Sequence, residues 1–219
     1  MKIIEIKNLH KVYTDNSVSV NALNGINLEF AEGEFSAIVG PSGSGKTTLL
    51  NIIGGLDDAT QGTVVIDNVE INQLSARKLT DFRMKNIGFV FQAYNLIPVL
   101  TAGENVEFIM QLQGAGKKER ENRTRELLQA VGLGEMTDRR PTKLSGGQQQ
   151  RVAVARALAS KPKFVLADEP TANLDSKSTE NLLDIMEQLN KEEKITFIFS
   201  THDARVVANA RRVITLEAG

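Results

Sequence analysis

The chain has 219 residues and a mass of 24.0 kDa, which suits one domain with a sizeable core. With 41% hydrophobic and 24% charged residues it is not a disordered or collagen-like chain, and a net charge of −1 argues against a dedicated nucleic-acid binder. The absence of cysteine excludes a disulfide scaffold, a cysteine nucleophile and a thiolate metal site, and the two histidines argue against a multi-histidine metal site.

Strands dominate the first third of the chain. Lys2–Leu9 alternates apolar and polar residues, which indicates a half-buried strand. Ile87–Phe91 is wholly apolar, as expected of a strand that is buried on both faces. Two pairs of apolar runs flank short turns, and each pair predicts a β-hairpin: Ile26–Phe30 with Phe35–Val39, and Gly62–Ile66 with Val69–Ile71.

Helices are predicted at Lys46–Ile53, from Ser75 to about Asn86, and at three consecutive segments of the middle third, namely Thr101–Gln113, Lys117–Val131 and Ser145–Ala159. The last third alternates strands and helices again: Phe164–Ala167, Ser176–Asn190, Ile195–Phe199, Asp203–Ala210 and Val213–Leu216. Because strands that alternate with helices form parallel sheets, we expect an α/β core with the middle helices inserted as a separate lobe.

No uninterrupted apolar run approaches the ~18–20 residues that a membrane span requires. The N-terminal residues Met1–Glu5 also lack the apolar region of a signal peptide. We therefore expect a soluble cytoplasmic protein, in which any membrane role comes through a partner.

A glycine-rich loop lies between the strand that ends at Val39 and the helix that begins at Lys46. Its sequence, Gly40-Pro41-Ser42-Gly43-Ser44-Gly45-Lys46-Thr47, matches the phosphate-binding pattern G-x-x-x-x-G-K-[ST] in the required strand–loop–helix context. The glycines let backbone N–H groups surround phosphate oxygens, and the helix N-terminus adds a positive dipole end. Lys46 can reach the β- and γ-phosphates, and the Thr47 hydroxyl can ligate Mg²⁺. We assign Thr48 to the same nucleotide site.

A second motif places two acids, Asp168 and Glu169, at the end of the strand Phe164–Ala167. In phosphate-loop enzymes such an Asp holds Mg²⁺, and the adjacent Glu can polarise an attacking water. Strands often end in acids, so this motif is weak by itself and gains weight from the phosphate loop. Together the two motifs predict phosphoryl transfer from ATP to water with Mg²⁺.

A third motif, Leu144-Ser145-Gly146-Gly147-Gln148, lies between the other two. By its chemistry alone it is a helix start, with Ser145 as the N-cap and an N-terminus able to bind an anion. In this order, however, the three motifs resemble the ATP-binding cassette (ABC) family, whose signature is LSGGQ, and the resemblance spans Ile3 to Leu216.

The resemblance implies an α/β P-loop NTPase fold with a mainly parallel core sheet, an antiparallel β subdomain and an inserted helical lobe. It implies one nucleotide-binding domain over residues 1–219, with the core formed by residues 1–92 and 160–219 and the lobe by residues 93–159.

Single positions acquire roles from the same resemblance. Tyr13 resembles the aromatic residue that stacks on adenine, although a half-buried strand aromatic is the alternative. Gln92 resembles the glutamine that senses Mg²⁺ and water and contacts the membrane partner. His202 resembles the histidine that contacts the γ-phosphate, and Glu169 resembles the catalytic base. Asp175, in Asn173-Leu174-Asp175, belongs to a loop that resembles the one crossing the dimer interface.

The family also implies a second copy of the chain as a partner. Two cassettes dimerise head to tail on ATP, and the signature of one subunit closes on the γ-phosphate that Lys46 of the other holds. Two-fold symmetry then makes two identical composite sites. The signature residues assigned to nucleotide binding are Ser145, Gly146, Gly147 and Gln148.

A finer resemblance concerns Gly88–Pro98, Leu100-Thr101, Glu104–Val106 and Gln148–Arg151. These segments look like the lipoprotein-releasing, macrolide-exporting and cell-division ABC ATPases. They imply a transmembrane permease that contacts Gln92–Pro98, although ordinary interlobe core is the alternative for Tyr94–Pro98. The chain would then lie on the inner face of the cell membrane.

Three functions compete on this basis. The first is an ATPase subunit that drives a permease to export or extract a substrate. The second is a relative that transmits force across a membrane to regulate an enzyme and moves nothing. The third is a soluble ABC protein acting on DNA or ribosomes, which is disfavoured because only 100 positions separate Gly45 from Ser145, without cysteine or sustained heptads. We expect no nucleic-acid partner.

Overall fold

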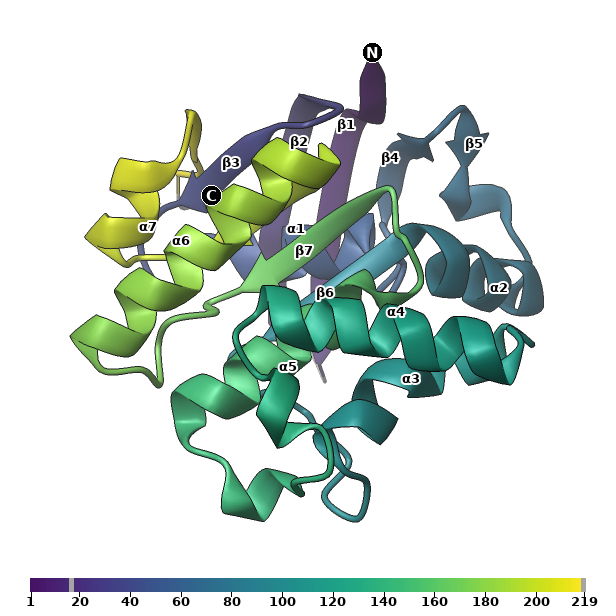
Figure 1. The fold of residues 1–219 in the computed structure, drawn as a ribbon. Coiled ribbons are helices and arrows are strands. Elements are labelled where there is room, and N and C mark those ends of the chain that lie inside the picture. Colours follow the sequence, from purple (N-terminus) through teal and green to yellow (C-terminus); the bar gives the residue numbers. More distant parts are fainter. Residues whose placement is uncertain (16–17, 218–219) are drawn as a thin grey trace.

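Two β-sheets organise the chain, and they differ in strand direction (Figure 1). The structure is a computed structural model that describes residues 1–15 and 18–217; residues 218–219, the end of the predicted domain, lie outside the described residues. Within those ranges, no helix has both the length and the apolar character that a membrane crossing demands.

The first sheet is antiparallel and has the strand order β2-β1-β4-β5. Its β4–β5 connection is the predicted hairpin, in which Val65 pairs with Glu70 and Ile66 with Val69. The turn residues Asp67 and Asn68 have φ angles of 47° and 64°, values that suit a tight hairpin turn and that Asn and Asp tolerate best among non-glycine residues. The strands are β1 (Lys2–Asp15), β2 (Val18–Ala31), β4 (Gln61–Ile66) and β5 (Val69–Glu70).

The second sheet is parallel and has the strand order β6-β7-β8-β3-β9. Alternate residues of one strand face different cores: Val165 belongs to the core under the helical lobe, and Leu166 to the core against the antiparallel sheet. Because both faces are covered, the strands read as continuous apolar runs. They are β3 (Phe35–Val39), β6 (Ile87–Phe91), β7 (Phe164–Asp168), β8 (Thr196–Ser200) and β9 (Arg212–Thr215).

The first predicted hairpin, Ile26–Phe30 with Phe35–Val39, is wrong. β2 pairs with β1, whereas β3 crosses to the other sheet and lies between β8 and β9. The reason is burial: Phe35, Ala37 and Ile38 are all fully buried, so β3 needs cover on both faces. The short turn after Ala31 joins two sheets, and it does not join two partners in one sheet.

Helices α3, α4, α5 and α6 pack on one face of the parallel sheet, whereas α1 lies between the two sheets (Figure 1). In the middle of the chain, α3, α4 and α5 pack on one another, and one buried cluster includes Val106 of α3, Leu127 of α4, Val154 of α5 and Val165 of β7. The lobe therefore shares its core with the parallel sheet, and the division at residues 93 and 159 stays a prediction. The helices are α1 (Lys46–Ile53), α2 (Ala76–Asn86), α3 (Ala102–Leu112), α4 (Lys117–Ala130), α5 (Gly146–Ala159), α6 (Ser176–Glu193) and α7 (Ala204–Asn209), with 3₁₀ turns at Ile71–Gln73, Gly134–Met136 and Pro141–Lys143.

The parallel sheet fixes where the chemistry can lie. All its strands point the same way, so the segments that follow β3, β6, β7 and β8 meet at one edge. The phosphate loop follows β3, Gln92 follows β6, Glu169 follows β7, and His202 comes two residues after β8. Ligands of such sheets bind at this edge.

Candidate active site

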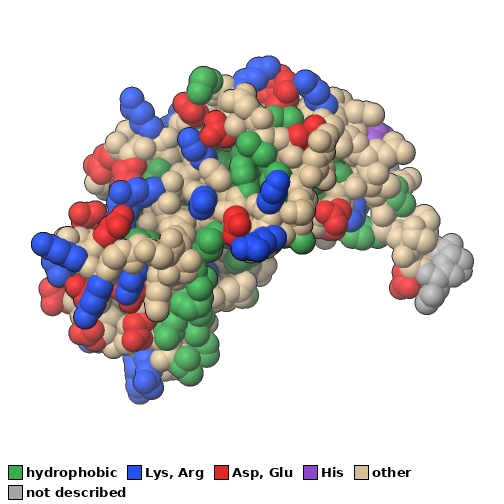
Figure 2. Space-filling view, turned by 90° about the vertical axis from the view of Figure 1, so that its right-hand side faces the viewer, with side chains coloured by type: hydrophobic (Ala, Val, Ile, Leu, Met, Phe, Trp, Pro, Cys, Tyr) green, Lys and Arg blue, Asp and Glu red, His purple; other side chains and the backbone are tan. Residues whose placement is uncertain are grey.

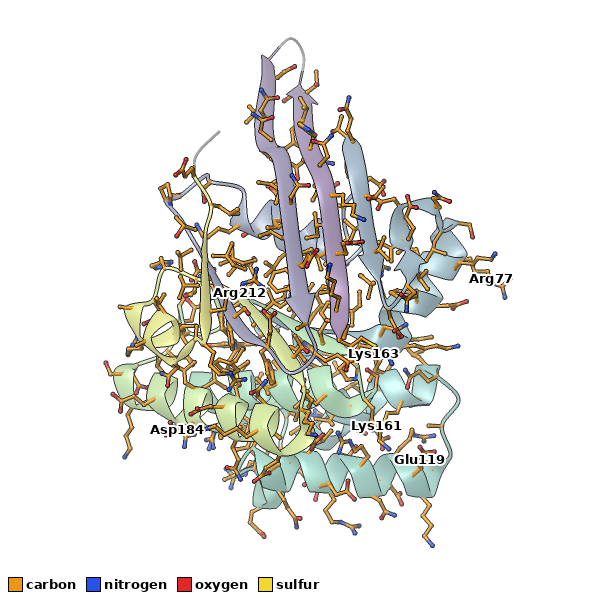
Figure 3. All side chains as sticks on the ribbon, turned by 90° about the horizontal axis from the view of Figure 1, so that it is seen from above. Arg77, Glu119, Lys161, Lys163, Asp184 and Arg212 are labelled. Carbon is orange, nitrogen blue, oxygen red and sulfur yellow. The ribbon has the colours of Figure 1, made fainter. Side chains whose placement is uncertain are left out.

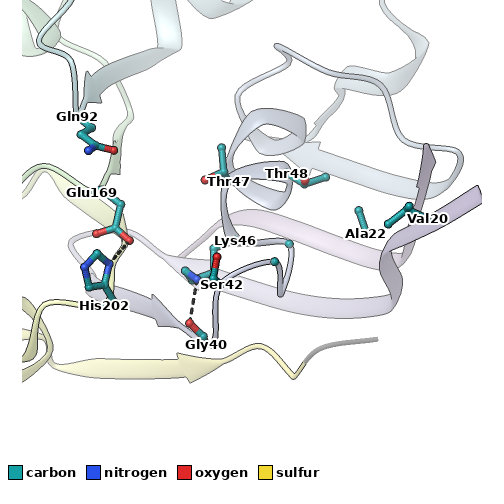
Figure 4. A pocket seen from close by; sticks show the side chains of 12 residues that line it. Val20, Ala22, Gly40, Ser42, Lys46, Thr47, Thr48, Gln92, Glu169 and His202 are labelled. Atoms are coloured by element: carbon teal, nitrogen blue, oxygen red, sulfur yellow. Dashed lines mark hydrogen bonds and ion pairs between the residues drawn. The ribbon is translucent and has the colours of Figure 1, made fainter. Parts of the chain in front are cut away.

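A cleft of about 550 Å³ opens at this edge of the sheet (Figure 4). Its volume lies within the range of small-molecule sites. Ten of its lining residues were predicted from the sequence, and Val20 and Ala22 of β2 were not. The lining residues are Val20, Ala22, Gly40, Ser42, Gly43, Gly45, Lys46, Thr47, Thr48, Gln92, Glu169 and His202.

The glycines of the phosphate loop are required by its geometry. Gly45 has a φ of 88°, and a Cβ there would lie 2.3 Å from the Ala22 carbonyl oxygen. Gly43 also has a positive φ, of 81°, and the space around its Cβ position is open. α1 begins after Gly45 with no side-chain cap, so its first N–H groups are left for a ligand. Pro41 and Ser44 belong to the loop but do not line the cleft, and Ser44 is buried.

Lys46 crosses the loop from its far end. Its Nζ donates to the carbonyl oxygens of Gly40 at 2.9 Å and Pro41 at 3.0 Å, and Figure 4 shows the first of these bonds. An ammonium group carries three N–H donors. It can therefore bind phosphate oxygens while the Lys46 side chain keeps its position across the loop. Lys46 thus closes the loop and presents a positive charge to the cleft.

Thr47 and Asp168 meet although 121 positions separate them. The Thr47 Oγ1 donates to Asp168 Oδ1 at 3.2 Å. A hydroxyl beside a carboxylate oxygen, next to a phosphate cradle, is the oxygen donor set that Mg²⁺ prefers. The residues present therefore fit an Mg²⁺–nucleotide: the cation has oxygen ligands, and the phosphates have N–H donors and Lys46.

Glu169 is held in an unusual backbone conformation. Its φ is 46°, a value that costs a non-glycine residue of the order of 1–3 kcal/mol and occurs mostly at functional sites. The Oε1 lies 2.7 Å from His202 Nδ1, and Oε2 accepts a bond of 3.3 Å from Thr201 Oγ1. The Glu169 side chain is 16% exposed, against 76% for His202. The carboxylate is mostly buried, whereas the imidazole that contacts it is mostly exposed to solvent.

Asp203 stabilises the segment after His202, and sequence reasoning did not single it out. Its side chain accepts hydrogen bonds from Arg205 and from Thr171 Oγ1 at 3.0 Å. Hydrogen bonding from Arg205 is the largest cause that lowers the Asp203 pKa, from 3.8 to about 2. As the residue before α7, Asp203 also carried an N-cap signal that could have revealed it.

The signature residues lie outside the cleft. Ser145 and Gln148 form a capping box, in which Gln148 N donates to Ser145 Oγ at 3.3 Å and Ser145 N to Gln148 Oε1 at 2.8 Å. A Cβ on Gly146 would lie 2.8 Å from Tyr94 Oη, and one on Gly147 would lie 2.9 Å from Ser178 Oγ. Both approaches are to side-chain atoms of neighbouring residues, and they do not bring the signature to the phosphate loop of its own chain.

Asp175 lies outside the cleft as well, as the N-cap of α6. Its carboxylate accepts from the backbone N and the hydroxyl of Ser178, at 2.9 and 2.7 Å, and hydrogen bonding from the Ser178 backbone is the largest cause that lowers its pKa. In the same loop, Asn173 Nδ2 donates to the Gln92 carbonyl oxygen at 3.0 Å. The structure therefore joins this loop to the segment after β6.

Tyr13 borders the cleft and does not line it. In the β1–β2 pairing it stands directly opposite Val20, which does line the cleft. Directly opposed residues point to the same face of a sheet, so the ring lies on the cleft side, and it is 42% exposed.

The sequence was compared with known families and proteins. A family model described as "ABC transporter" matches residues 23–172. An uncharacterized ABC transporter ATP-binding protein of Thermotoga maritima is 48% identical, over 100% of this chain and 93% of that one. The macrolide export ATP-binding/permease protein MacB of Mannheimia succiniciproducens is 47% identical over 100% of this chain and 34% of its own length. The lipoprotein-releasing system ATP-binding protein LolD 1 of Caulobacter vibrioides is 44% identical over 99% and 93%.

Solved structures give the same result for the fold. The ATP-binding cassette MJ0796 of Methanocaldococcus jannaschii, as a dimer in a post-hydrolysis state with ADP and Pi, has a TM-score of 0.90 to this chain. The two are 45% identical, and the match covers 99% of this chain and 96% of that one. The predicted fold class, family and ATPase class are confirmed.

Proposed function

This chain belongs to the ABC transporter family, and we propose that it is the subunit that binds and hydrolyses ATP with Mg²⁺ to drive a separate transmembrane permease. One observation carries the proposal. A single cleft gathers the phosphate loop, Lys46, Thr47 beside Asp168, and the Glu169–His202 pair.

The phosphates would lie in the loop between Gly40 and Thr47. Unpaired N–H groups and the dipole of α1 favour anions there, and Lys46 adds a full positive charge. Thr47 and Asp168, with Gln92 at the cleft wall, would hold Mg²⁺, which neutralises charge on the phosphates. The catalytic residues are then Glu169, Gln92 and His202.

Glu169 would act as the base that orients and polarises the attacking water. Its carboxylate lies at the end of β7, next to the Asp168 oxygen that contacts Thr47. His202 occupies one carboxylate oxygen in this structure. Since the imidazole is mostly exposed, it can turn toward a γ-phosphate and leave that oxygen to a water molecule.

A second copy of the chain would complete the site. None of the predicted residues Ser145, Gly146, Gly147, Gln148 and Asp175 lines the cleft of its own chain. The first four form the N-terminus of α5, which is suited to an anion. Dimeric structures of the MJ0796 cassette support a homodimer. In a head-to-tail dimer, the partner's α5 would close on the γ-phosphate.

The permease would dock on the segment Gln92–Pro98. An apolar cleft of about 280 Å³ lies beside it, with Phe89, Asn95 and Phe108 in its wall. Leu112 of the same wall is 57% exposed, and the face in Figure 2 carries a band of hydrophobic side chains. Arg156 donates to the carbonyl oxygens of Tyr94 and Asn95, so the segment is held in a fixed shape.

This docking would place the chain on the inner face of the cell membrane. On the face of the protein that Figure 2 draws, positive and negative side chains are intermixed, without the basic stripe of a nucleic-acid site. The relatives named for macrolide export and lipoprotein release favour transport over force transmission without cargo.

The test is the substitution Glu169→Gln, which removes the base and keeps the shape of the side chain. We expect ATP turnover to fall by about 100-fold or more, ATP affinity to stay within about twofold, and an ATP-bound dimer to accumulate. Turnover is measured as phosphate release, and the dimer by size-exclusion chromatography with ATP. Near-normal turnover would remove Glu169 from the role of base.

The matched control is Glu119→Gln. Glu119 lies on α4, exposed and directed outward, as Figure 3 shows. The same chemical change there should leave turnover and dimerisation unaltered.

A further inference from the structure

A cluster of three side chains fixes the ring of Tyr13. The Tyr13 hydroxyl donates to Asp57 Oδ2 at 2.6 Å, and Lys11 Nζ donates to Asp57 Oδ1, also at 2.6 Å. Lys11 Nζ further donates to the Asp58 carbonyl oxygen at 2.7 Å and lies 4.7 Å from the centre of the Tyr13 ring. The hydroxyl end of the ring is anchored, and one of its faces is covered by a cation.

The cluster joins the border of the cleft to the phosphate loop. Asp57 follows α1, and its backbone N donates to the Asn51 carbonyl oxygen at 3.3 Å. The other end of α1 carries Lys46 and Thr47. The Tyr13 ring is therefore held at a set distance from the phosphate cradle by one rigid helix.

The charges of the cluster keep it in this state at neutral pH. Burial and the bond to Asp57 raise the pKa of Tyr13, so the hydroxyl stays a donor. Burial alone would raise the pKa of Asp57, but the bonds from Lys11 and Tyr13 outweigh it and lower that pKa. The side chains of Lys11 and Asp57 are 12% and 28% exposed, so solvent screens the pair only in part.

We infer that Asp57 and Lys11 are positioning residues for the adenine base: they fix the Tyr13 ring and leave only one face on which a base can stack. The inference rests on the proposed function, because it takes ATP as the ligand. A ring that is already fixed loses less freedom when a base binds, and this raises affinity without touching the reacting atoms. This gain in affinity comes from the contact with the adenine base and not from the contacts with the phosphates.

The test compares two ligands, ATP and inorganic tripolyphosphate, which has the phosphates but no base. For Asp57→Asn, Lys11→Met and Tyr13→Phe we expect the Kd of ATP to rise about three- to tenfold. The Kd of tripolyphosphate should change less than about twofold, since the phosphate loop is intact. In turnover, KM for ATP should rise and kcat should stay the same. Calorimetry gives both Kd values.

The matched control is Asp58→Asn, which removes a carboxylate charge as Asp57→Asn does, but at the next residue of the chain. The Asp58 side chain is exposed, and among the described residues it makes no hydrogen bond. This variant should bind both ligands like the unmodified chain. The double variant Tyr13→Phe, Asp57→Asn should be no weaker for ATP than Asp57→Asn alone, because Asp57→Asn already removes the bond from the Tyr13 hydroxyl.

Equal weakening of both ligands would show that the cluster only stabilises the fold, and it would overturn the inference. Unchanged ATP affinity in Asp57→Asn would overturn it too. Lys46→Ala separates this failure from a failure of the proposed function. If Lys46→Ala loses both ligands, the nucleotide site stands whatever Asp57 does; if it loses neither, the proposed function fails.

A spectroscopic signal checks the geometry directly. The chain has no tryptophan and two tyrosines, so Tyr94→Phe leaves Tyr13 as the single emitter. A carboxylate that accepts the hydroxyl proton quenches tyrosine emission, so adding Asp57→Asn should brighten it, and adding Asp58→Asn should not. Equal emission in the two would contradict the anchored ring.

Discussion

Two glycine-rich helix starts, at α1 and α5, look alike in the sequence and differ in the structure. α1 follows Gly45 and has no side-chain cap, so its N–H groups face the cleft. α5 follows Ser145, whose capping box with Gln148 satisfies two backbone donors within the chain. The first start is therefore open to an anion in the single chain. The second is stable by itself, and its remaining donors, those of Gly146 and Gly147, are available to a partner.

Breaking the open helix start should have the largest effect. We expect Lys46→Ala to weaken ATP binding by about 100-fold, because it removes a full positive charge beside the loop, and charge-assisted hydrogen bonds are the strong ones. Lys118→Ala, on the exposed face of α4, is the control and should change nothing. Titration calorimetry measures both, and equal affinities in the two variants would mean that the loop does not hold the phosphates.

The next effect concerns the segment that carries His202. Folding lowers the pKa of Asp203 from 3.8 to about 2, chiefly through hydrogen bonding from Arg205. Its stabilisation is therefore fully present above about pH 4 and is lost as the pH falls toward 2. We expect Asp203→Asn to lower the free energy of unfolding by about 1–2 kcal/mol at pH 7, after allowance for screening by solvent, and by little near pH 2.

Urea unfolding at the two pH values measures this difference. The control is Asp184→Asn on the exposed face of α6, which Figure 3 shows directed outward and which should have no effect at either pH. A loss of stability that is the same at both pH values would contradict the assigned cause.

The capped helix start predicts a smaller change. Removing the cap with Ser145→Ala should cost about 1 kcal/mol of stability and weaken the ATP-bound dimer, while ATP affinity of the single chain stays the same. Ser75→Ala is a matched control, because Ser75 also precedes a helix but makes no side-chain cap bond. Thermal unfolding and dilution of the dimer check the two parts. Weaker ATP binding by the single chain would show that the two helix starts are not separate.

The sequence predicted the local features well. The phosphate loop, the two acids at the end of β7 and the cap at Ser145 depend on residues within a few positions of one another, and all are present. Strand pairing between segments that lie farther apart in the sequence was harder to predict. The turn after Ala31 has the form of a hairpin connection, and only the two-sided burial of β3 shows that the chain changes sheet there.

The cleft wall shows the same limit. Val20 and Ala22 reach the site only because the antiparallel sheet packs against the phosphate loop, so closely that a Cβ on Gly45 would lie 2.3 Å from the Ala22 carbonyl oxygen. The anchor between Tyr13 and Asp57 joins residues 44 positions apart. The residues near Val20, Ala22, Tyr13 and Asp57 in the sequence give no sign of these contacts. Neither the cleft wall nor the anchor could therefore be predicted from the sequence.

The central claim is that the phosphate loop serves its own chain and the signature serves the partner's site. It is tested by mixing two inactive variants, Lys46→Ala and Gly147→Asp. A Cβ at Gly147 meets only the flexible Ser178 side chain, so that variant should fold, and its carboxylate would repel a γ-phosphate. In a mixed dimer, an intact Lys46 then faces an intact signature at one site. The account predicts that mixing restores roughly a quarter of normal ATP turnover, from random pairing and one working site per mixed dimer. A mixture as inactive as its parents would contradict the account.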